Sequence, residues 1–260
     1  MNNQVSDEDP GQESRGYVSK SFWEDRLGSH TDLAGTGEPG LSLSYNRACY
    51  RLREHVLARE LDRAGVELTG ANVLDVGSGV GFFVDFYLRR AARVTAVELT
   101  EVGTRYLEER FPEARVKQGD VVDCELDTDY DVVNAFDVLY HIVEENRWQQ
   151  ALRRIARALR PQGLLLLTDV LSPVKQKLAA HNVMRDRMRY QDVLSQEGVV
   201  VLSEVPTHYL LNRELGLFRG LNRMPSLLYA IDRTLMALSA PAPEPTNRLL
   251  VARRQGSARP

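Results

Sequence analysis

A glycine-rich run with a carboxylate at its head is the most specific chemical feature of this sequence. Gly77, Gly79 and Gly81 are spaced by two, and Asp75 stands two residues before the first of them. Glycines let the backbone pass close to a ligand, and a helix that begins here would add free N–H groups. The spacing differs from the G-x-G-x-x-G of dinucleotide binders, and a carboxylate repels a pyrophosphate but attracts an ammonium or sulfonium group. The run therefore predicts a ligand that carries positive charge.

Two further carboxylates follow at the ends of apolar runs. Glu98 ends the run at residues 94–97, where an acidic side chain can accept hydrogen bonds from both hydroxyls of a ribose. Asp120 ends the run at 116–119, in a place to accept from an adenine amino group. The ends of successive parallel strands lie at one edge of a sheet, where open α/β folds bind their ligands. We therefore expect Asp75, Glu98 and Asp120 to line the same edge.

Alternating strands and helices would position these residues. Such alternation predicts a mostly parallel sheet with helices on both faces, and the apolar run at 164–167 is typical of a strand buried on both faces. The expected strands are residues 72–76, 93–98, 114–118, 130–136, 163–170, 199–205 and 248–252, and the expected helices between them are 80–91, 101–110, 145–159 and 182–196.

The segments outside this alternation predict a cap and an insertion. Helices are expected at 21–27 and 45–64, with a loop between them, and 213–239 is expected to be a helical insertion over the substrate side. The predicted organisation is a disordered N-terminus (1–18), an N-terminal helical cap (19–66), a Rossmann-like core (67–211), a helical insertion (212–240), the final strand of the core (241–254) and a flexible tail (255–260).

In combination these segments resemble the class I methyltransferases, which use S-adenosylmethionine. The resemblance covers residues 71 to about 171, with a looser continuation to 254. It implies a seven-stranded Rossmann-like sheet whose last strand is antiparallel, and a cofactor that leaves as S-adenosylhomocysteine. By this resemblance the glycine run holds the methionine part, Glu98 the ribose and Asp120 the adenine, with Asp137 beside the sulfonium and the acceptor. The implied cofactor-binding residues are Asp75, Gly77, Ser78, Gly79, Gly81, Phe82, Glu98, Leu99, Asp120, Val121, Asp137 and Val138.

The candidate general base is a histidine. Methyl transfer to a hydroxyl needs a base, and His141 follows the fourth strand at the cofactor edge with a side chain suited to that role. The alternative is that His141 only caps the strand and holds its loop. His30 and His208 are rivals for the same role. The segment 134–141 lacks the Pro-Pro-aromatic run of enzymes that methylate exocyclic base amines, which argues against those substrates.

The cap supplies candidate substrate-binding residues. Trp23, Arg26 and Tyr45 flank the glycine-rich loop at 35–40, where aromatic rings and an arginine could face the sulfonium side or bind an acidic acceptor. The alternative is that the aromatic residues form a packing stripe. Arg185, Arg187 and Arg189 are spaced by two, so they are expected to spread around a helix as a solvated surface.

Composition excludes several classes of protein. A net charge of −3 and a pI near 6.0 supply no global attraction to nucleic acid or to an anionic membrane. No apolar run is long enough to span a bilayer, and residues 1–10 do not have the apolar core of a secretory signal. Two distant cysteines form no metal-binding spacing, so no metal is expected. We expect a cytoplasmic protein, and a homodimer is left open.

The leading function at this point is O-methylation of a small molecule, such as a sugar or a secondary metabolite. The alternatives are N- or C-methylation, or a cyclase that binds the cofactor without transferring its methyl group. A noncatalytic regulatory partner is disfavoured, because every implied cofactor position holds a suitable residue.

Overall fold

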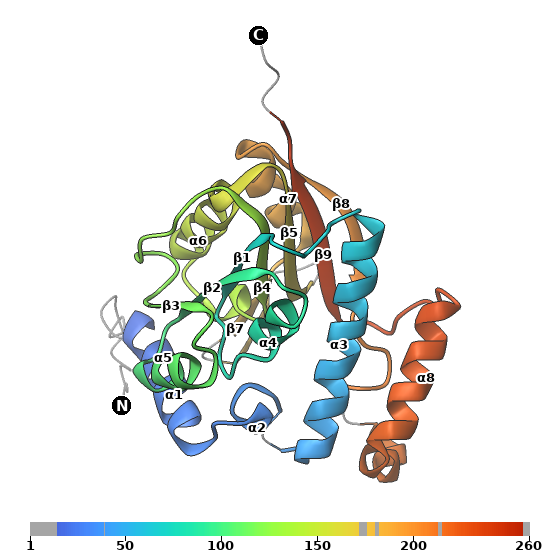
Figure 1. Ribbon diagram of the computed structural model, residues 1–260. Coiled ribbons are helices and arrows are strands. Elements are labelled where there is room, and N and C mark those ends of the chain that lie inside the picture. Colours follow the sequence, from blue (N-terminus) through green and yellow to red (C-terminus); the bar gives the residue numbers. More distant parts are fainter. Residues whose placement is uncertain (1–14, 39, 172–175, 180–181, 213–214, 257–260) are drawn as a thin grey trace, which may run out of the picture.

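A seven-stranded sheet forms the centre of the protein (Figure 1). The computed structural model describes residues 15–38, 40–171, 176–179, 182–212 and 215–256. The strand order is β3-β2-β1-β4-β5-β9-β8. The strands of this sheet are β1 (Asn72–Val76), β2 (Arg93–Glu98), β3 (Arg115–Gln118), β4 (Tyr130–Phe136), β5 (Leu159–Val170), β8 (Val199–Pro206) and β9 (Asn247–Arg254).

The strand directions confirm the predicted fold class. β1 pairs in parallel with both β2 and β4, and the pairs β2–β3 and β4–β5 are also parallel. β9 runs antiparallel to β5 and to β8, as the family resemblance implied. The strand order reverses between β1 and β4, so the carboxyl ends of these two strands flank the crevice where such sheets bind ligands.

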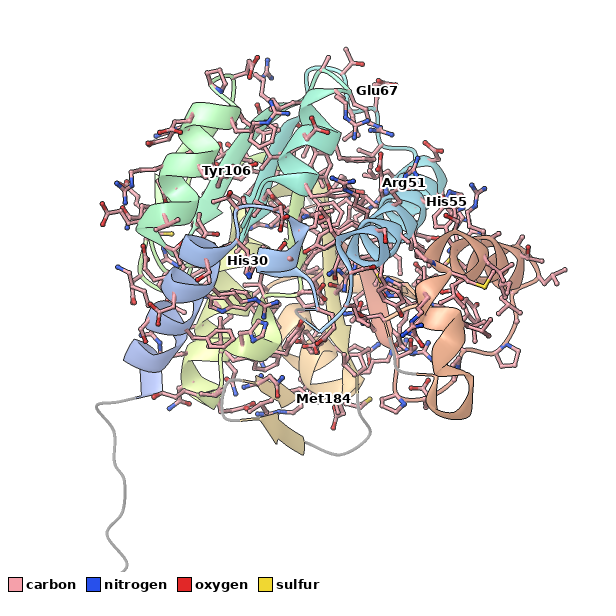
Figure 2. All side chains as sticks on the ribbon, turned by 90° about the horizontal axis from the view of Figure 1, so that it is seen from below. His30, Arg51, His55, Glu67, Tyr106 and Met184 are labelled. Carbon is pink, nitrogen blue, oxygen red and sulfur yellow. The ribbon has the colours of Figure 1, made fainter. Side chains whose placement is uncertain are left out.

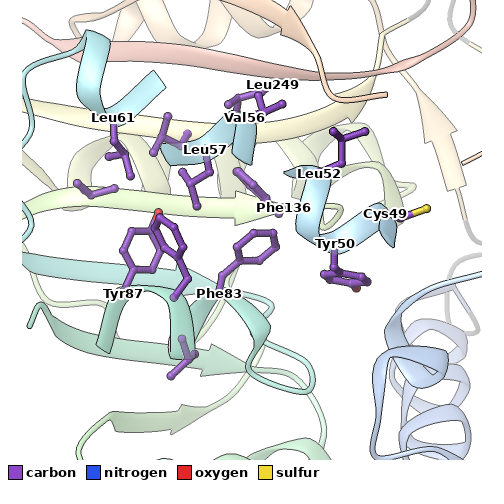
Figure 3. Close-up of a cluster of buried hydrophobic side chains, with 14 of the residues drawn as sticks. Cys49, Tyr50, Leu52, Val56, Leu57, Leu61, Phe83, Tyr87, Phe136 and Leu249 are labelled. Carbon is purple, nitrogen blue, oxygen red and sulfur yellow. The ribbon is translucent and has the colours of Figure 1, made fainter. Parts of the chain in front are cut away.

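Helices cover both faces of the sheet. The helical segments are α1 (Arg15–Ser29), α2 (Leu33–Thr36), α3 (Leu43–Arg63), α4 (Phe82–Leu88), α5 (Glu101–Arg110), η1 (Leu139–His141), α6 (Glu145–Ala158), α7 (Arg187–Gln196), η2 (Gly216–Arg223) and α8 (Pro225–Ala237). Leu164 and Leu166 of β5 face a core built with α3, α4, α5 and α8, and Figure 3 shows part of that core. Leu165 and Leu167 face a second core built with α6 and α7, which explains the continuous apolar run in the sequence.

The N-terminal region contains more helix than the sequence predicted. α1 begins at Arg15, so residues 15–18 of the segment expected to be disordered are helical, and residues 1–14 lie outside the described part of the chain. The expected loop at 28–44 contains the short helix α2, whose N-cap is Asp32. The side chain of Asp32 accepts a hydrogen bond from the Ala34 N–H, which satisfies one free donor of that helix. Residues 257–260 of the predicted tail also lie outside the described residues.

Two further expectations need correction. The helix expected at 182–196 begins only at Arg187, because β7 (Asn182–Met184) pairs with β6 (Gln176–Ala179) in a separate hairpin. The insertion packs against α3 rather than over the substrate side (Figure 1). The buried carboxylate of Asp232 in α8 accepts hydrogen bonds from the backbone N–H groups of residues 209–211, which fixes the insertion there. None of the described helices is long and apolar enough to cross a membrane.

A buried carboxyl group joins the two central strands. Asp75 of β1 lies opposite Asn134 of β4, and the Asn134 amide donates a 2.5 Å hydrogen bond to Asp75 Oδ1. Tyr87 of α4 donates to the other end of the same amide, over 3.3 Å. Burial raises the pKa of Asp75 from 3.8 to about 7, although the hydrogen bonds oppose that rise. The folded protein therefore holds a proton on Asp75 at pH values where the unfolded chain has lost it.

This difference makes Asp75 a cost to stability at high pH. Because the folded pKa lies above the unfolded one, the favourable contribution is present at low pH and is lost as the pH rises through about 7. Asp75→Asn should therefore raise the free energy of unfolding at pH 8 by about 1–4 kcal/mol, at about 1.4 kcal/mol per pKa unit. The gain should shrink as the pH is lowered toward 4. Urea unfolding at several pH values measures it, with the exposed Asp62→Asn as control. A variant that is less stable at pH 8 would contradict this account.

Candidate functional site

A cavity opens at the carboxyl edge of the sheet, between the central strands and the N-terminal cap. About 1030 Å³ of free space lies between its walls, and part of this space is open to solvent. Its walls come from α1, α2, α3 and the ends of β1, β2 and β4. The lining residues are Trp23, Leu27, Thr36, Tyr50, Val76, Gly77, Ser78, Gly79, Val80, Phe82, Phe83, Val97, Glu98, Leu99, Gly119, Asp120, Val121, Phe136, Asp137, Val138, His141 and Ile142.

The glycine loop directs its backbone donors inward, to the next strand. The N–H groups of Gly77 and Ser78 donate to the Val97 carbonyl over 2.8 and 3.1 Å. The Gly79 N–H donates over 2.9 Å to the Glu98 carboxylate. A loop that binds phosphate presents these N–H groups to the ligand. Here the N–H groups of Gly77, Ser78 and Gly79 donate to β2, and the Glu98 carboxylate lies where a bound anion would lie. The loop therefore suits a neutral or cationic ligand.

The loop needs glycine because its neighbours approach too closely for a side chain. Gly77 and Gly79 both have positive φ, at 68° and 52°. A Cβ atom at Gly77 would lie 2.4 Å from the Val138 side chain, and one at Gly79 would lie 2.6 Å from the Thr36 side chain. The two glycines therefore let η1 on one side and α2 on the other pack directly onto the loop. This contact closes the cavity above the strand ends.

Glu98 holds the loop and faces the cavity. One carboxylate oxygen accepts from Gly79, and the other accepts from the backbone N–H and the hydroxyl of Thr100, over 2.9 and 2.7 Å. The side chain is buried, and Oε2, which accepts from the Gly79 N–H, has a second lone pair. Glu98 can therefore accept hydrogen bonds from a ligand while it keeps its protein partners. Thr100 also caps α5, whose first residue follows it.

Asp120 is held from two sides at the end of the loop after β3. Its Oδ1 accepts from the Val122 N–H over 2.8 Å, and its Oδ2 pairs with Arg147 of α6 over 2.9 Å. Leu99 and Val121 line the cavity beside it. A flat ring placed here would lie against apolar side chains and have a carboxylate at its edge.

Asp137 is the most heavily bonded of the predicted site residues. Its carboxylate pairs with Arg53 of α3 over 2.7 Å and accepts from Thr168 of β5 over 3.0 Å and Asn247 of β9 over 2.6 Å. Its φ of 59° is unusual for a residue other than glycine and needs such support. Asp137 lines the cavity, so this single side chain joins three elements to the cavity edge of the sheet.

His141 lies on the cavity wall, in contact with the cap. It ends η1, and its ring centroid lies 5.0 Å from that of Trp23 in an edge-to-face arrangement. Both residues line the cavity, so the predicted base and one predicted cap residue meet there. The aromatic residues Tyr50, Phe83 and Phe136 line it as well. An imidazole on the wall of a largely aromatic pocket has the chemistry to accept a proton from a bound ligand.

Two predicted cofactor residues lie behind the wall. Asp75 is covered by the loop that follows it and is bonded to Asn134. Gly81 is buried against α5, where a Cβ atom would lie 2.2 Å from the Phe111 ring. Both residues shape the loop from beneath rather than lining the cavity. The other ten predicted cofactor residues all line it.

Four predicted substrate or base residues also lie elsewhere. Arg26 donates to the carbonyls of Gly37 and Ala34, so it holds the cap together. His30 is exposed just beyond the end of α1 (Figure 2). Tyr45 is fully buried, with Asn222 donating to its hydroxyl over 3.4 Å. His208 is buried between Thr207 and the Cys49 carbonyl. None of these four residues is among those that line the cavity.

The sequence reasoning missed residues that act through other residues. Glu24 of α1 accepts from the N–H groups of Glu101 and Val102, both over 3.0 Å, so it caps α5 from outside and holds α1 over the cavity. Arg53 is a charged residue among the apolar residues of the buried face of α3, and this position in the sequence could have identified it as a functional residue. Within the described residues, no three metal-binding side chains gather to form a site for an ion.

Comparisons with known proteins agree with this geometry. A family profile described as a methyltransferase domain matches residues 50–217. A probable S-adenosylmethionine-dependent methyltransferase from Mycobacterium tuberculosis is 31% identical over 120 residues, which cover 46% of this chain and 42% of that protein. A ubiquinone biosynthesis O-methyltransferase from Xanthomonas oryzae is 32% identical over 113 residues, 41% of this chain and 46% of that protein. The matches therefore span less than half the length of either relative.

A solved structure extends the likeness to the whole fold. Magnesium protoporphyrin IX methyltransferase from Synechocystis, with S-adenosylmethionine bound, superposes with a TM-score of 0.64 over 95% of this chain and 100% of that one, at 15% identity. At this identity the likeness concerns the fold alone. The family profile covers more than half of this chain. The protein therefore belongs to the methyltransferase-domain family, in its class I, Rossmann-like form.

Proposed function

We propose that this protein transfers the methyl group of S-adenosylmethionine to a hydroxyl group of a small molecule. The observation that carries the proposal is a single cavity that joins the glycine loop and Glu98 to Asp137 and His141. Membership of a methyltransferase family supports the donor. The cap closes over the cavity with Trp23 and Leu27, which favours a small acceptor over a macromolecule.

The residues of the cavity fit this cofactor. When bound, S-adenosylmethionine supplies an electrophilic methyl group on a positively charged sulfur. Glu98 would accept from the ribose hydroxyls, and Asp120 would accept from the adenine amino group beside Leu99 and Val121. The glycine loop would hold the amino-acid end, because Gly77, Ser78 and Gly79 line the cavity. The carboxylates of Glu98, Asp120 and Asp137 line the cavity, and the N–H groups of the glycine loop already donate to β2. Both features favour a cationic ligand over a dinucleotide.

The remaining part of the cavity would hold the acceptor. Its aromatic walls would exclude water and orient an apolar ring or chain. His141 would take the proton of the acceptor hydroxyl as the new carbon–oxygen bond forms, and would later release it to solvent. A sugar or a secondary metabolite that carries a free hydroxyl is the substrate class we infer. The O-methyltransferase from Xanthomonas supports oxygen as the acceptor atom.

The cofactor part of the proposal is tested by binding. S-adenosylmethionine should bind at micromolar strength or better, and Glu98→Ala should weaken it by about 1.5–3 kcal/mol, the range for hydrogen bonds to charged groups. Isothermal calorimetry measures both. Glu108→Ala, an exposed change on α5, serves as the matched control and should bind like the unmodified protein. Binding of a nicotinamide dinucleotide in place of the sulfonium cofactor would refute the proposal.

The catalytic part is tested at His141. His141→Ala should slow methyl transfer by about 10²–10⁴-fold and leave S-adenosylhomocysteine affinity nearly unchanged. His30→Ala is the control, because His30 is exposed and lies off the cavity. Loss of cofactor binding together with the rate would make His141 structural, and an unchanged rate would place the base elsewhere.

The acceptor is found by supplying pools of small hydroxylated molecules with methyl-labelled cofactor and reading the products by mass spectrometry. A methyltransferase forms S-adenosylhomocysteine in proportion to methylated product. Product formed without S-adenosylhomocysteine would indicate a cyclase. Methyl label found on nitrogen or carbon would show that the acceptor atom is not a hydroxyl oxygen.

A further inference from the structure

Arg185 is a buried arginine that lies away from the cavity and was expected on the surface. It follows β7 directly and precedes Asp186, the N-cap of α7. Only 1% of its area is exposed. Arg187 and Arg189, by contrast, keep 52% and 46% of their side-chain area exposed. The expected solvated surface is therefore correct for two of the three arginines and wrong for Arg185.

The hydrogen bonds of Arg185 converge on the turn that follows His141. Its Nη2 group donates to the Ile142 carbonyl over 2.9 Å and is 3.4 Å from the Val143 carbonyl. Its Nε group pairs with Glu145, the first residue of α6, over 3.1 Å. Ile142 lines the cavity beside His141. A single planar guanidinium thus holds both ends of the turn between η1 and α6.

The other side of Arg185 rests on a buried aromatic stack. The guanidinium carbon lies 4.6 Å from the centre of the Trp148 ring. That ring contacts Tyr190 edge-to-face, at 5.0 Å between centroids, and the Tyr190 hydroxyl donates to Asp169 near the end of β5. A guanidinium fork matches several acceptors and stacks on an aromatic ring at the same time, which an ammonium group cannot do.

Burying a charged group is unfavourable unless its partners compensate, so this arrangement needs a reason beyond packing. Among the described residues, the contact that links Arg185 to the cavity is its hydrogen bond to the backbone of Ile142, the residue after His141. We propose that Arg185 is a positioning residue, which fixes the turn after η1 and so keeps the His141 imidazole facing the cavity. The proposal rests on the function proposed above, in which His141 is the base.

The test reads the position of His141 directly, without the acceptor. Histidines labelled with ¹³C at Cε1 are observed by NMR with S-adenosylhomocysteine bound, and the signal of His141 is identified by its loss in His141→Ala. Arg185→Lys keeps the charge and loses the fork and the stacking. The His141 signal should shift or broaden in this variant, while the signals of His30, His55 and His208 stay in place. S-adenosylhomocysteine affinity should change by less than about threefold, because Arg185 touches no predicted cofactor residue.

The matched control is Arg189→Gln. Arg189 pairs with the same Glu145 over 2.7 Å, from the exposed side, and should leave the His141 signal unmoved. If Arg185→Lys does not fold, Glu145→Gln loosens the same guanidinium and should shift the His141 signal in its place. An unmoved His141 signal in the folded variant would overturn the proposal. Equal shifts of all histidine signals, with loss of cofactor binding, would do so too, because Arg185 would then be structural only.

A second readout uses the rate once an acceptor is known. Arg185→Lys should lower kcat by about 10–100-fold, the cost of misplacing a catalytic group by about 1 Å, with KM for the cofactor unchanged. An unchanged kcat would contradict the proposal. A protein that transfers no methyl group at all would remove the proposed function, whereas the NMR shift would still decide whether Arg185 positions His141.

Discussion

The cavity edge of the sheet depends on the carboxylate of Asp137. Three elements that are far apart in the sequence reach it: α3 through Arg53, β5 through Thr168 and β9 through Asn247. A charge that is only 18% exposed, like this one, is stable only with several strong partners, and the loss of one partner leaves the others uncompensated. The same residue ends β4 with positive φ and lines the cavity. The ion pair and hydrogen bonds of Asp137 therefore set the direction in which the chain enters η1, and with it the position of His141.

The glycine loop is the second constraint on the site, because Gly77 and Gly79 have no side chains. Because Gly77 and Gly79 leave room, Val138 and Thr36 pack onto the loop from opposite sides. Because the loop N–H groups donate to Val97 and Glu98, the loop is rigid and offers little to a phosphate. The choice between a dinucleotide and a sulfonium cofactor is thus made by where the backbone donors point, not by the glycines alone.

The two faces of the sheet supply different walls of the site. On one face, α3 brings Tyr50 to the cavity and Arg53 to Asp137, and its apolar side packs on the same sheet (Figure 3). On the other face, α6 and α7 enclose Trp148, Tyr190 and Arg185 behind the turn that carries His141. The cap then closes over both, held by Glu24 on the first turn of α5. Each wall is fixed by packing on its own side of the sheet, and the cavity is where the walls meet.

The sequence predicted the fold class, the order of the seven strands of the main sheet and, through the family resemblance, twelve cofactor residues, of which ten line the cavity. Those features are local: apolar runs and turn residues set each element, and strand ends in a parallel sheet share one edge. The sequence left undecided which polar side chains face the cavity. Asp75 has the right type and spacing but lies beneath the loop, bonded to Asn134. Tyr45 is buried and contacts Asn222 of the insertion, and His208 is buried between Thr207 and the Cys49 carbonyl of α3. Arg185 and Arg53 point to partners more than 40 residues away in the chain. Only the tertiary structure decided these roles, because burial and ion pairing depend on how distant elements pack, and no local pattern encodes that packing.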